Sequence, residues 1–222
     1  MGIGALAVAL KISGSFLDWS VLGSLATVFT FLTGLLTAVF AVPWILRFLK
    51  YPEQIRRDLS HPIRSQFFPT MPISLILIGI GLQRTFTVFP EPVQQVSLGL
   101  FFLGSAGIFG FGLLLTKILF TNTNIETKHG VFAWFIPPVS HIIIPVLGFM
   151  LLASGLSGAL AQTVYIISLS GLGIGTFMFL FLTPVILYRY AYEDLPDSKL
   201  APTFLIGIAP TAVLIINAEN LV

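Results

Sequence analysis

The chain has 222 residues, of which 56% are hydrophobic and only 9% are charged. Water-soluble domains average about 25% charged residues, so this composition predicts an all-α polytopic membrane protein. The net charge of +2 is too small to indicate a nucleic-acid partner, and the absence of cysteine excludes disulfides and thiolate metal sites. Nothing in the sequence resembles a phosphate-binding loop, a catalytic triad or a dinucleotide fingerprint, so we expect neither an enzyme nor a cofactor.

Seven apolar segments follow one another along the chain. A helix needs roughly 20 apolar residues to cross a hydrocarbon core of about 30 Å, so the first segment is too short to span alone. We expect the segments at residues 2–12, 20–46, 65–83, 93–118, 131–153, 160–188 and 200–217. They form a single transmembrane domain, 1–222. The abrupt start at Met1 and the lack of a C-terminal tail predict part of a larger protein, incomplete at both ends.

Proline alternates between these segments. The even segments have long interiors without proline, whereas the odd ones contain Pro69, Pro72, Pro137, Pro138, Pro145, Pro202 and Pro210. A proline inside a helix removes a hydrogen bond, and in lipid this is tolerated only where protein or a water-filled cavity satisfies the freed backbone groups. The alternation predicts inner, broken odd helices and outer, unbroken even helices around a pore. Pro138 and Pro210 should therefore not face lipid.

Basic residues sort by loop. Nine lie in the loops that follow even segments, and only Lys11 and Arg84 lie on the opposite side; the nine are Arg47, Lys50, Arg56, Arg57, Arg64, Lys117, Lys128, Arg189 and Lys199. Cytoplasmic loops carry the excess of lysine and arginine. We therefore expect these loops and the N-terminus to be cytoplasmic.

Small or weakly polar residues form a stripe on each of three odd segments. At about 100° per residue, such residues share one helix face and indicate a narrow pathway lined by hydroxyls and backbone. The alternative for any one stripe is ordinary helix packing, which also uses small residues. With one residue from the first segment, the predicted pore-lining set is Gly4, Thr70, Ser74, Pro138, His141, Pro145, Thr203, Gly207 and Pro210.

No Asp, Glu, Lys or Arg lies in the middle of any segment. Such residues mark proton relays and cation sites, so their absence argues against a proton pump. A broken helix can instead direct backbone N–H groups and its positive end towards an anion.

Histidine occurs three times, and the three positions are scattered, so we expect no metal site. His141 lies deep in a segment, where it either senses pH or forms a neutral hydrogen bond to a carbonyl freed by Pro145. We favour the second. His61, which precedes Pro62, is expected to cap the next helix, and His129 is expected to be solvated.

Glycine pairs mark the even segments. Ala106 and Gly110 are four residues apart, as are Gly171 and Gly175, a spacing that permits close helix contact within a subunit or between subunits.

Two proline-containing stretches resemble one known family. HPIRSQFFPTMPISLILIG, at 61–79, resembles the third helix of the tellurite-resistance/dicarboxylate transporter family, and WFIPPVSHIIIP, at 134–145, resembles its fifth. MGIGALAVAL and LAPTFLIGIAP are similar to its first and seventh helices. The family includes plant slow-type anion channels, the bacterial tellurite-resistance permease, and fungal malate and sulfite transporters. The resemblance implies ten helices in five hairpins around a pore, a homotrimer, and a phenylalanine plug partly from the ninth helix.

Together these features predict a channel or channel-like permease in the plasma membrane, surrounded by lipid, that passes small inorganic anions or C4-dicarboxylates. One alternative is a proton-coupled malate or sulfite carrier with His141 as the coupling group. Another, from a different class, is a non-conducting membrane interaction subunit.

Overall fold

The computed structural model describes residues 1–86 and 90–221, and every regular element in those ranges is helical. The elements, in chain order, are α1 (Gly2–Phe16), α2 (Ser20–Lys50), α3 (Pro52–Ser60), η1 (Arg64–Phe67), α4 (Thr70–Thr85), α5 (Pro90–Thr121), η2 (Thr127–His129), η3 (Phe132–Phe135), α6 (Ile136–Ile142), α7 (Ile144–Ala153), α8 (Gly158–Tyr192), η4 (Ser198–Ile208) and α9 (Ala209–Leu221). Elements labelled η are 3₁₀ helices.

All seven predicted segments are present as helices, within a few residues of their expected ends. Six of them are long and apolar enough to cross a bilayer, and α1, with 15 residues, is the shorter one. The prediction of an all-α polytopic membrane protein is therefore confirmed. The sequence did not predict the short α3, a polar helix after α2 whose Ile55 alone is buried.

The even spans are single uninterrupted helices, whereas three odd spans change geometry along their length. α2, α5 and α8 run for 31, 32 and 35 residues. The third, fifth and seventh segments each begin with 3₁₀ turns (η1, η3 and η4) before continuing as α-helix. Most prolines of the odd spans lie in or just after these turns, whereas Pro43 in α2 and Pro184 in α8 are accommodated without a change of helix type.

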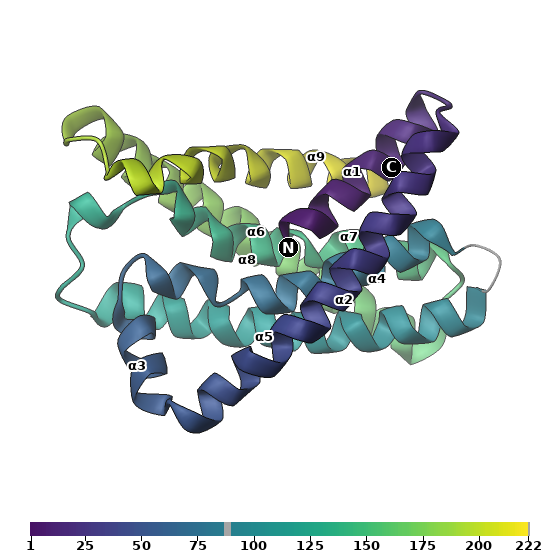
Figure 1. Ribbon diagram of the computed structural model, residues 1–222, viewed down its shortest axis with the longest axis horizontal. Coiled ribbons are helices and arrows are strands. Elements are labelled where there is room, and N and C mark those ends of the chain that lie inside the picture. Colours follow the sequence, from purple (N-terminus) through teal and green to yellow (C-terminus); the bar gives the residue numbers. More distant parts are fainter. Residues whose placement is uncertain (87–89, 222) are drawn as a thin grey trace.

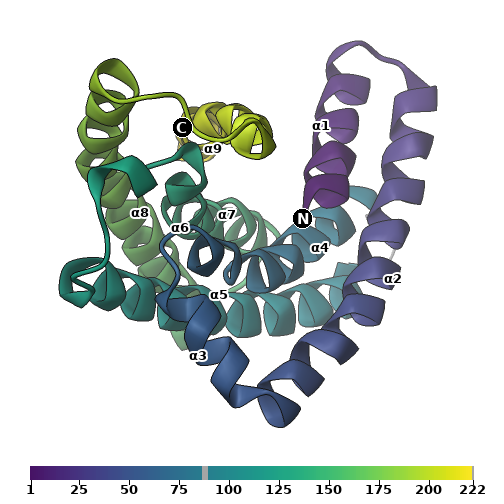
Figure 2. The ribbon, with the colours of Figure 1, turned by 60° about the vertical axis from the view of Figure 1, so that its left-hand side comes forward.

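The fifth segment lies at the centre of the bundle. In Figure 1, α6 and α7 run behind α4, with α5 along one side and α1 and α9 along the other. Figure 2 shows α2 and α8 flanking this centre, and α1 and α9 facing each other across its upper side. In the most apolar part of each span, 67% and 83% of the residues in the third and fifth segments are buried, against 22%, 33% and 22% in the even ones.

The seventh segment differs from this pattern, since only 17% of the corresponding residues are buried. Exposed apolar side chains on it include Leu205, Ile208 and Ile215, and α1 likewise exposes Leu6 and Phe16. Pro138 and Pro210 are both buried, as expected. The predicted inner position thus holds for segments three and five, while α1 and α9 bury one face each and leave the other uncovered in this chain.

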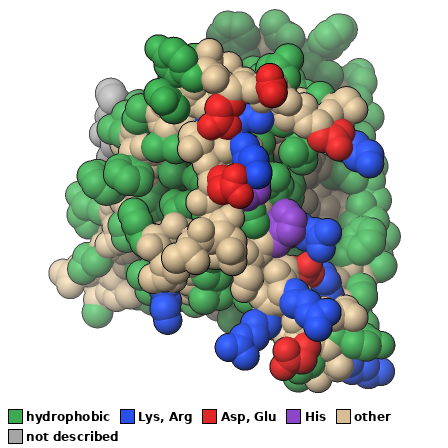
Figure 3. All heavy atoms as spheres, turned by 90° about the vertical axis from the view of Figure 1, so that its left-hand side faces the viewer, with side chains coloured by type: hydrophobic (Ala, Val, Ile, Leu, Met, Phe, Trp, Pro, Cys, Tyr) green, Lys and Arg blue, Asp and Glu red, His purple; other side chains and the backbone are tan. Residues whose placement is uncertain are grey.

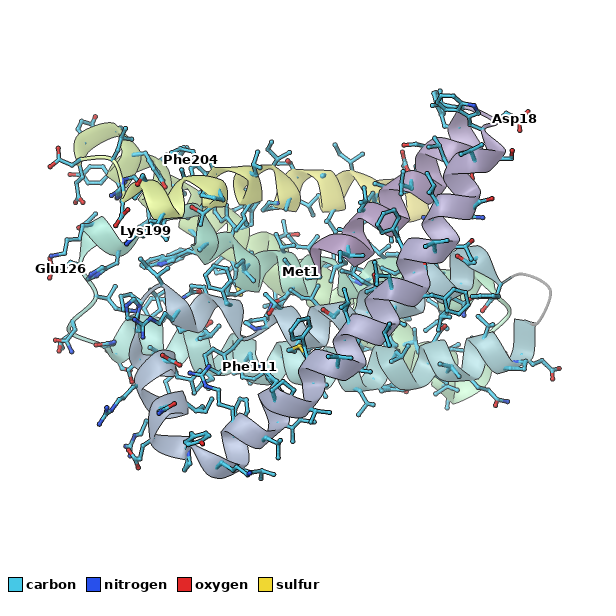
Figure 4. The ribbon with its side chains drawn as sticks, in the orientation of Figure 1. Met1, Asp18, Phe111, Glu126, Lys199 and Phe204 are labelled. Carbon is cyan, nitrogen blue, oxygen red and sulfur yellow. The ribbon has the colours of Figure 1, made fainter. Side chains whose placement is uncertain are left out.

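One end of the bundle gathers most of the charged side chains, and we call it the charged end. It is formed by α3, by residues 122–131 and by residues 193–199. Figure 3 looks onto this end and shows basic, acidic and histidine side chains side by side. In Figure 4, Glu126 and Lys199 lie at this end and Asp18 at the opposite one. All three loops that follow even segments therefore meet at one side of the bundle, which is the condition that the charge-based topology requires.

Specific contacts hold the charged end together. Asp58 forms ion pairs with Arg47 and with Arg64, the second at 3.3 Å. Asn122 Nδ2 donates to the Ser60 carbonyl at 2.9 Å and so joins the end of α5 to α3. These contacts join α2, α3, η1 and the end of α5 at the charged end.

His61 caps the turn that leads into η1, as predicted. Its Nδ1 accepts hydrogen bonds from the backbone N–H groups of Ile63 and Arg64, at 3.2 and 3.3 Å. Burial, and secondarily the Arg64 guanidinium, lower the pKa of His61, which favours the neutral ring that this acceptor role requires.

Candidate functional site

The fifth segment is broken at its middle, between α6 and α7. Pro145 has no N–H, so the carbonyl of His141 loses its usual helical donor. Ile143 N donates to the Val139 carbonyl at 3.0 Å, an α-type bond, whereas Val146 N donates to the Ile143 carbonyl at 3.2 Å, a 3₁₀-type bond. Among the described residues, the carbonyl of Ile142, which Val146 would serve in an unbroken helix, is thereby left without a main-chain donor.

Asn217 of α9 supplies the missing donor. Its Nδ2 lies 2.7 Å from the Ile142 carbonyl oxygen, and the side chain is only 1% exposed. An unsatisfied carbonyl inside a membrane is unfavourable by several kcal/mol in isolation, so this bond docks the seventh segment on the break in the fifth. Asn217 lies on the same helical stripe as Thr203, Gly207 and Pro210. A polar amide within an apolar span is the sequence feature that could have identified Asn217 as functional, but the predicted site did not include it.

His141 is buried in the break and makes a local hydrogen bond. Its exposed fraction is 2%, and Nδ1 lies 2.8 Å from the carbonyl oxygen of Pro137, which also accepts from Ser140 Oγ at 2.6 Å. The expectation of a histidine bonded to a backbone carbonyl holds, but the carbonyl comes from the preceding turn. The carbonyl that Pro145 frees is that of His141 itself, which the His141 ring does not bond.

The ring of His141 points towards the outer helices. It packs edge-on against Phe109 of α5, with 5.4 Å between ring centroids. A Cβ on Gly112 would lie 2.3 Å from His141 Cε1, so this glycine makes room for the ring. The ring also borders an apolar cavity of about 330 Å³ between α5 and α8. The His141 ring therefore contacts α5 and shares a cavity with residues of α8.

Two glycines of α8 let the broken helix approach it closely. A Cβ on Gly171 would lie 2.8 Å from the His141 carbonyl oxygen, and one on Gly175 would lie 2.8 Å from both Ile142 N and Pro138 O. The Gly171–Gly175 pair is thus a contact within the subunit. Ala106 and Gly110, by contrast, face outward from α5, where a Cβ on Gly110 would meet nothing within 4 Å.

The other predicted residues occupy separate places. Gly4 allows α1 to approach Thr33 and Leu77, and Gly207 allows η4 to approach the Phe132 ring, whose distance from an added Cβ would be 2.8 Å. Ser74 is buried and bonds to the Thr70 carbonyl at 2.9 Å. Thr70 borders a hollow at the charged end. Thr203, Pro145 and Pro210 are buried. In the described part of the chain, the predicted pore-lining residues therefore do not all line one common space. Their pore-lining role stays a prediction.

Two helices begin in the middle of their spans. α7 starts at Ile144, halfway along the fifth segment, and α9 starts at Ala209, halfway along the seventh. Both starts continue preceding helical turns: Val146 N donates to the Ile143 carbonyl, and Ala209 N donates to the Ile206 carbonyl. In the described ranges no three His, Cys, Asp or Glu side chains come close enough together to ligate a metal ion.

These features define a class: a helical membrane protein whose central spans are broken at proline and docked on each other through buried amide and glycine contacts. The chain belongs to the voltage-dependent anion channel family, whose sequence model matches residues 1–221. The resemblance noted in the two proline-containing stretches is thereby confirmed.

Two proteins of Methanocaldococcus jannaschii, both named as uncharacterized transporters, are similar to this chain. Each is 31% identical over 224 residues, and each match covers the whole of this chain. The chain spans 63% of the length of one and 62% of the length of the other.

We expect His141→Gln to leave anion flux nearly unchanged between pH 5 and pH 8. The ring is enclosed by α5 and α8 and bonded to the Pro137 carbonyl, so it offers no exposed charge to a permeating ion. Flux through liposomes, measured across this pH range for both proteins, checks the expectation. A pH-dependent flux in the wild type that disappears in His141→Gln would contradict it and favour proton coupling.

Proposed function

We propose that the protein is a non-enzymatic anion channel or channel-like permease that passes small inorganic anions or C4-dicarboxylates. The observation that carries this proposal is the break of the fifth segment at Ile143 and Pro145, docked by Asn217 and accompanied by a second mid-span helix start in α9. Membership of the voltage-dependent anion channel family and similarity to two transporters support the same conclusion.

Selectivity for anions is supported by the chemistry of the broken helices. The start of α7 lies at the break in the fifth segment and carries the positive end of a helix dipole, and the middle of each span has no acidic side chain. A permeant anion would be stabilised by N–H dipoles and would meet no fixed negative charge there. Following the family resemblance, we also propose a homotrimer in the plasma membrane, in which the further helices that the resemblance implies cover α1 and α9.

A proton-coupled malate or sulfite carrier is the second candidate. It is favoured only by His141, the one titratable side chain at the break, and the enclosure of its ring by α5 and α8 weakens that case. A non-conducting interaction subunit is the third, and the exposed faces of α1 and α9 are compatible with it.

The test is anion flux through liposomes that contain the full-length protein. We expect chloride, nitrate or malate to move down its own gradient, with a reversal potential that follows the anion and no requirement for a pH gradient. Ser74→Phe should reduce flux, and Ser74→Ala, which keeps the space, should not. Dependence on a pH gradient would indicate the carrier, whereas flux equal to that of empty liposomes for every anion would contradict transport.

Membrane orientation is open to a direct test, because the chain has no cysteine of its own. Single cysteines at the exposed positions Gln54 and Asn124 should resist impermeant thiol reagents in intact cells, since the charge bias places both loops inside. A cysteine at Ser157, at the opposite end of the bundle, should be labelled and serves as the control. Labelling of Gln54→Cys from outside would reverse the proposed topology.

A further inference from the structure

Arg189, in the last turn of α8, is a buried charge without a hydrogen-bond partner in the described residues. The residue is 3% exposed, and neither Nε nor Nη1 has an acceptor. Its guanidinium carbon lies 4.8 Å from the centroid of the neighbouring Tyr190 ring, which gives only a cation–π contact. None of the ion pairs found in the described chain includes Arg189. A buried charge that nothing neutralises is strongly destabilising, so this guanidinium calls for an anionic partner.

Arg189 borders a hollow of about 580 Å³ at the charged end, between residues 128–129 and residues 192–200. Two further donor groups border it. His129 Nδ1 accepts the Glu126 N–H at 3.0 Å, so a neutral ring carries its proton on Nε2 as a donor. Lys128 lies beside it, paired with Glu126 at 2.7 Å. Nε and Nη1 are enclosed by protein, so a ligand in the hollow reaches the guanidinium through Nη2.

Three carboxylates also border the hollow, and they limit what can bind. Asp197 is occupied, since its Oδ1 accepts the Lys199 N–H at 3.0 Å and the Ser198 hydroxyl at 3.3 Å. Asp194 is exposed and Glu193 partly so, and neither is within 4.0 Å of a basic side chain. Their charges lie towards water, where screening is strong, whereas Arg189 lies in the protein.

We propose that this hollow binds a small oxyanion, a carboxylate or a phosphate, with the Arg189 guanidinium as its principal ligand. The guanidinium keeps its charge at every physiological pH, and a charge-assisted N–H···O bond from Nη2 to a carboxylate or phosphate oxygen is stronger than a neutral one. None of the nine predicted pore-lining residues borders the hollow. The proposed oxyanion site is thus distinct from the proposed pathway. A binding measurement tests it, whether or not the protein conducts anions.

Binding is tested with the purified full-length protein in detergent, titrated with sodium phosphate and with sodium malate at constant ionic strength. The readout is calorimetry, with ligand-induced thermal shift as the second measurement. The wild type should bind at least one of them saturably, and Arg189→Gln should bind about tenfold more weakly or worse. Arg189→Lys, which keeps the charge but not the guanidinium, should fall between them. Lys199→Gln is the matched control, because Lys199 is a basic residue at the same end that does not border the hollow, and its affinity should equal that of the wild type.

A second variant protects the test against misfolding of the Arg189 substitutions. Glu193→Gln combined with Asp194→Asn changes only partly or fully exposed side chains and should tighten oxyanion binding, because two like charges are removed from the rim. Equal affinity in the wild type and a folded Arg189→Gln would overturn the proposal. So would loss of binding in the carboxylate variant, which would indicate a cation site.

The oxyanion can come from solution or from a lipid headgroup, because the hollow lies at the end of a membrane span. Nanodiscs of phosphatidylglycerol and of phosphatidylcholine separate the two sources. If phosphatidylglycerol weakens phosphate binding in the wild type but not in Arg189→Gln, the natural ligand is a headgroup; equal affinity in both nanodiscs identifies a free solute. A protein that binds but does not conduct would leave this site standing and would contradict only the proposed transport.

Discussion

Replacing Gly175 with alanine is expected to destabilise the protein by about 2 kcal/mol, and replacing it with leucine to prevent folding. The added Cβ would lie 2.8 Å from Ile142 N and from Pro138 O. Both are backbone atoms, so neither can rotate away, and α8 must separate from α6. Overpacking of this kind costs about 1 to 3 kcal/mol, more than the gain of up to about 1 kcal/mol that alanine gives in a helix.

Gly173 provides the matched control on the same helix. It is exposed, and a Cβ there would meet nothing within 4 Å. Gly173→Ala should therefore be neutral or slightly stabilising. Thermal unfolding in detergent, followed by circular dichroism, compares the two variants. If Gly175→Ala were as stable as Gly173→Ala, the close contact between α8 and α6 would not exist in the folded protein.

Replacing Asn217 with leucine is expected to destabilise the docking of α9 by about 1 to 2 kcal/mol. The substitution removes the only hydrogen bond that the described residues offer to the carbonyl of Ile142, and leaves this carbonyl unsatisfied in the interior. Because the bond joins residues 75 positions apart, its loss should loosen the seventh segment from the fifth without melting either helix. Flux through the reconstituted protein should fall as well, if the break forms part of the pathway.

Thr211→Val is the control for this experiment. Thr211 lies on the same helix and is exposed, and its hydroxyl bonds locally to the Ile208 carbonyl at 2.9 Å. A surface change of this kind should alter stability by less than about 0.5 kcal/mol. Unfolding measured by denaturant titration in mixed micelles separates the two variants. Wild-type stability in Asn217→Leu would mean that another donor, or water, serves the Ile142 carbonyl.

The glycines of α8 and the amide of α9 act on the same short stretch of backbone, residues 138–142. Gly175 permits contact with it from one helix, and Asn217 satisfies it from another. A break at Pro145 would be unfavourable in an isolated helix, but here two other segments compensate for it. This arrangement explains how the most deeply buried span of the chain can also be the most irregular one.

The amino-acid sequence by itself determined the class of protein and the positions of its spans. Composition indicates a membrane protein because too few charged residues are present to cover a water-exposed surface. The length of each apolar segment matches the thickness of the bilayer that it must cross. Proline placement predicted the irregular third, fifth and seventh spans, although Pro43 in α2 and Pro184 in α8 leave their helices unbroken. The family was recognised from two such proline-containing stretches, 61–79 and 134–145.

Only the tertiary structure decided which neighbour each face meets. Periodicity placed Pro138, His141 and Pro145 on one stripe, but it could not indicate that the His141 ring contacts Phe109 and Gly112, or that a Cβ on Gly148 would strike Ser168 of α8. The donor for Ile142 lies 75 residues away, and Arg189 is buried by segments that follow and precede it. Local hydrogen-bonding rules act within a few residues, whereas burial and the pairing of buried polar groups depend on how distant segments pack.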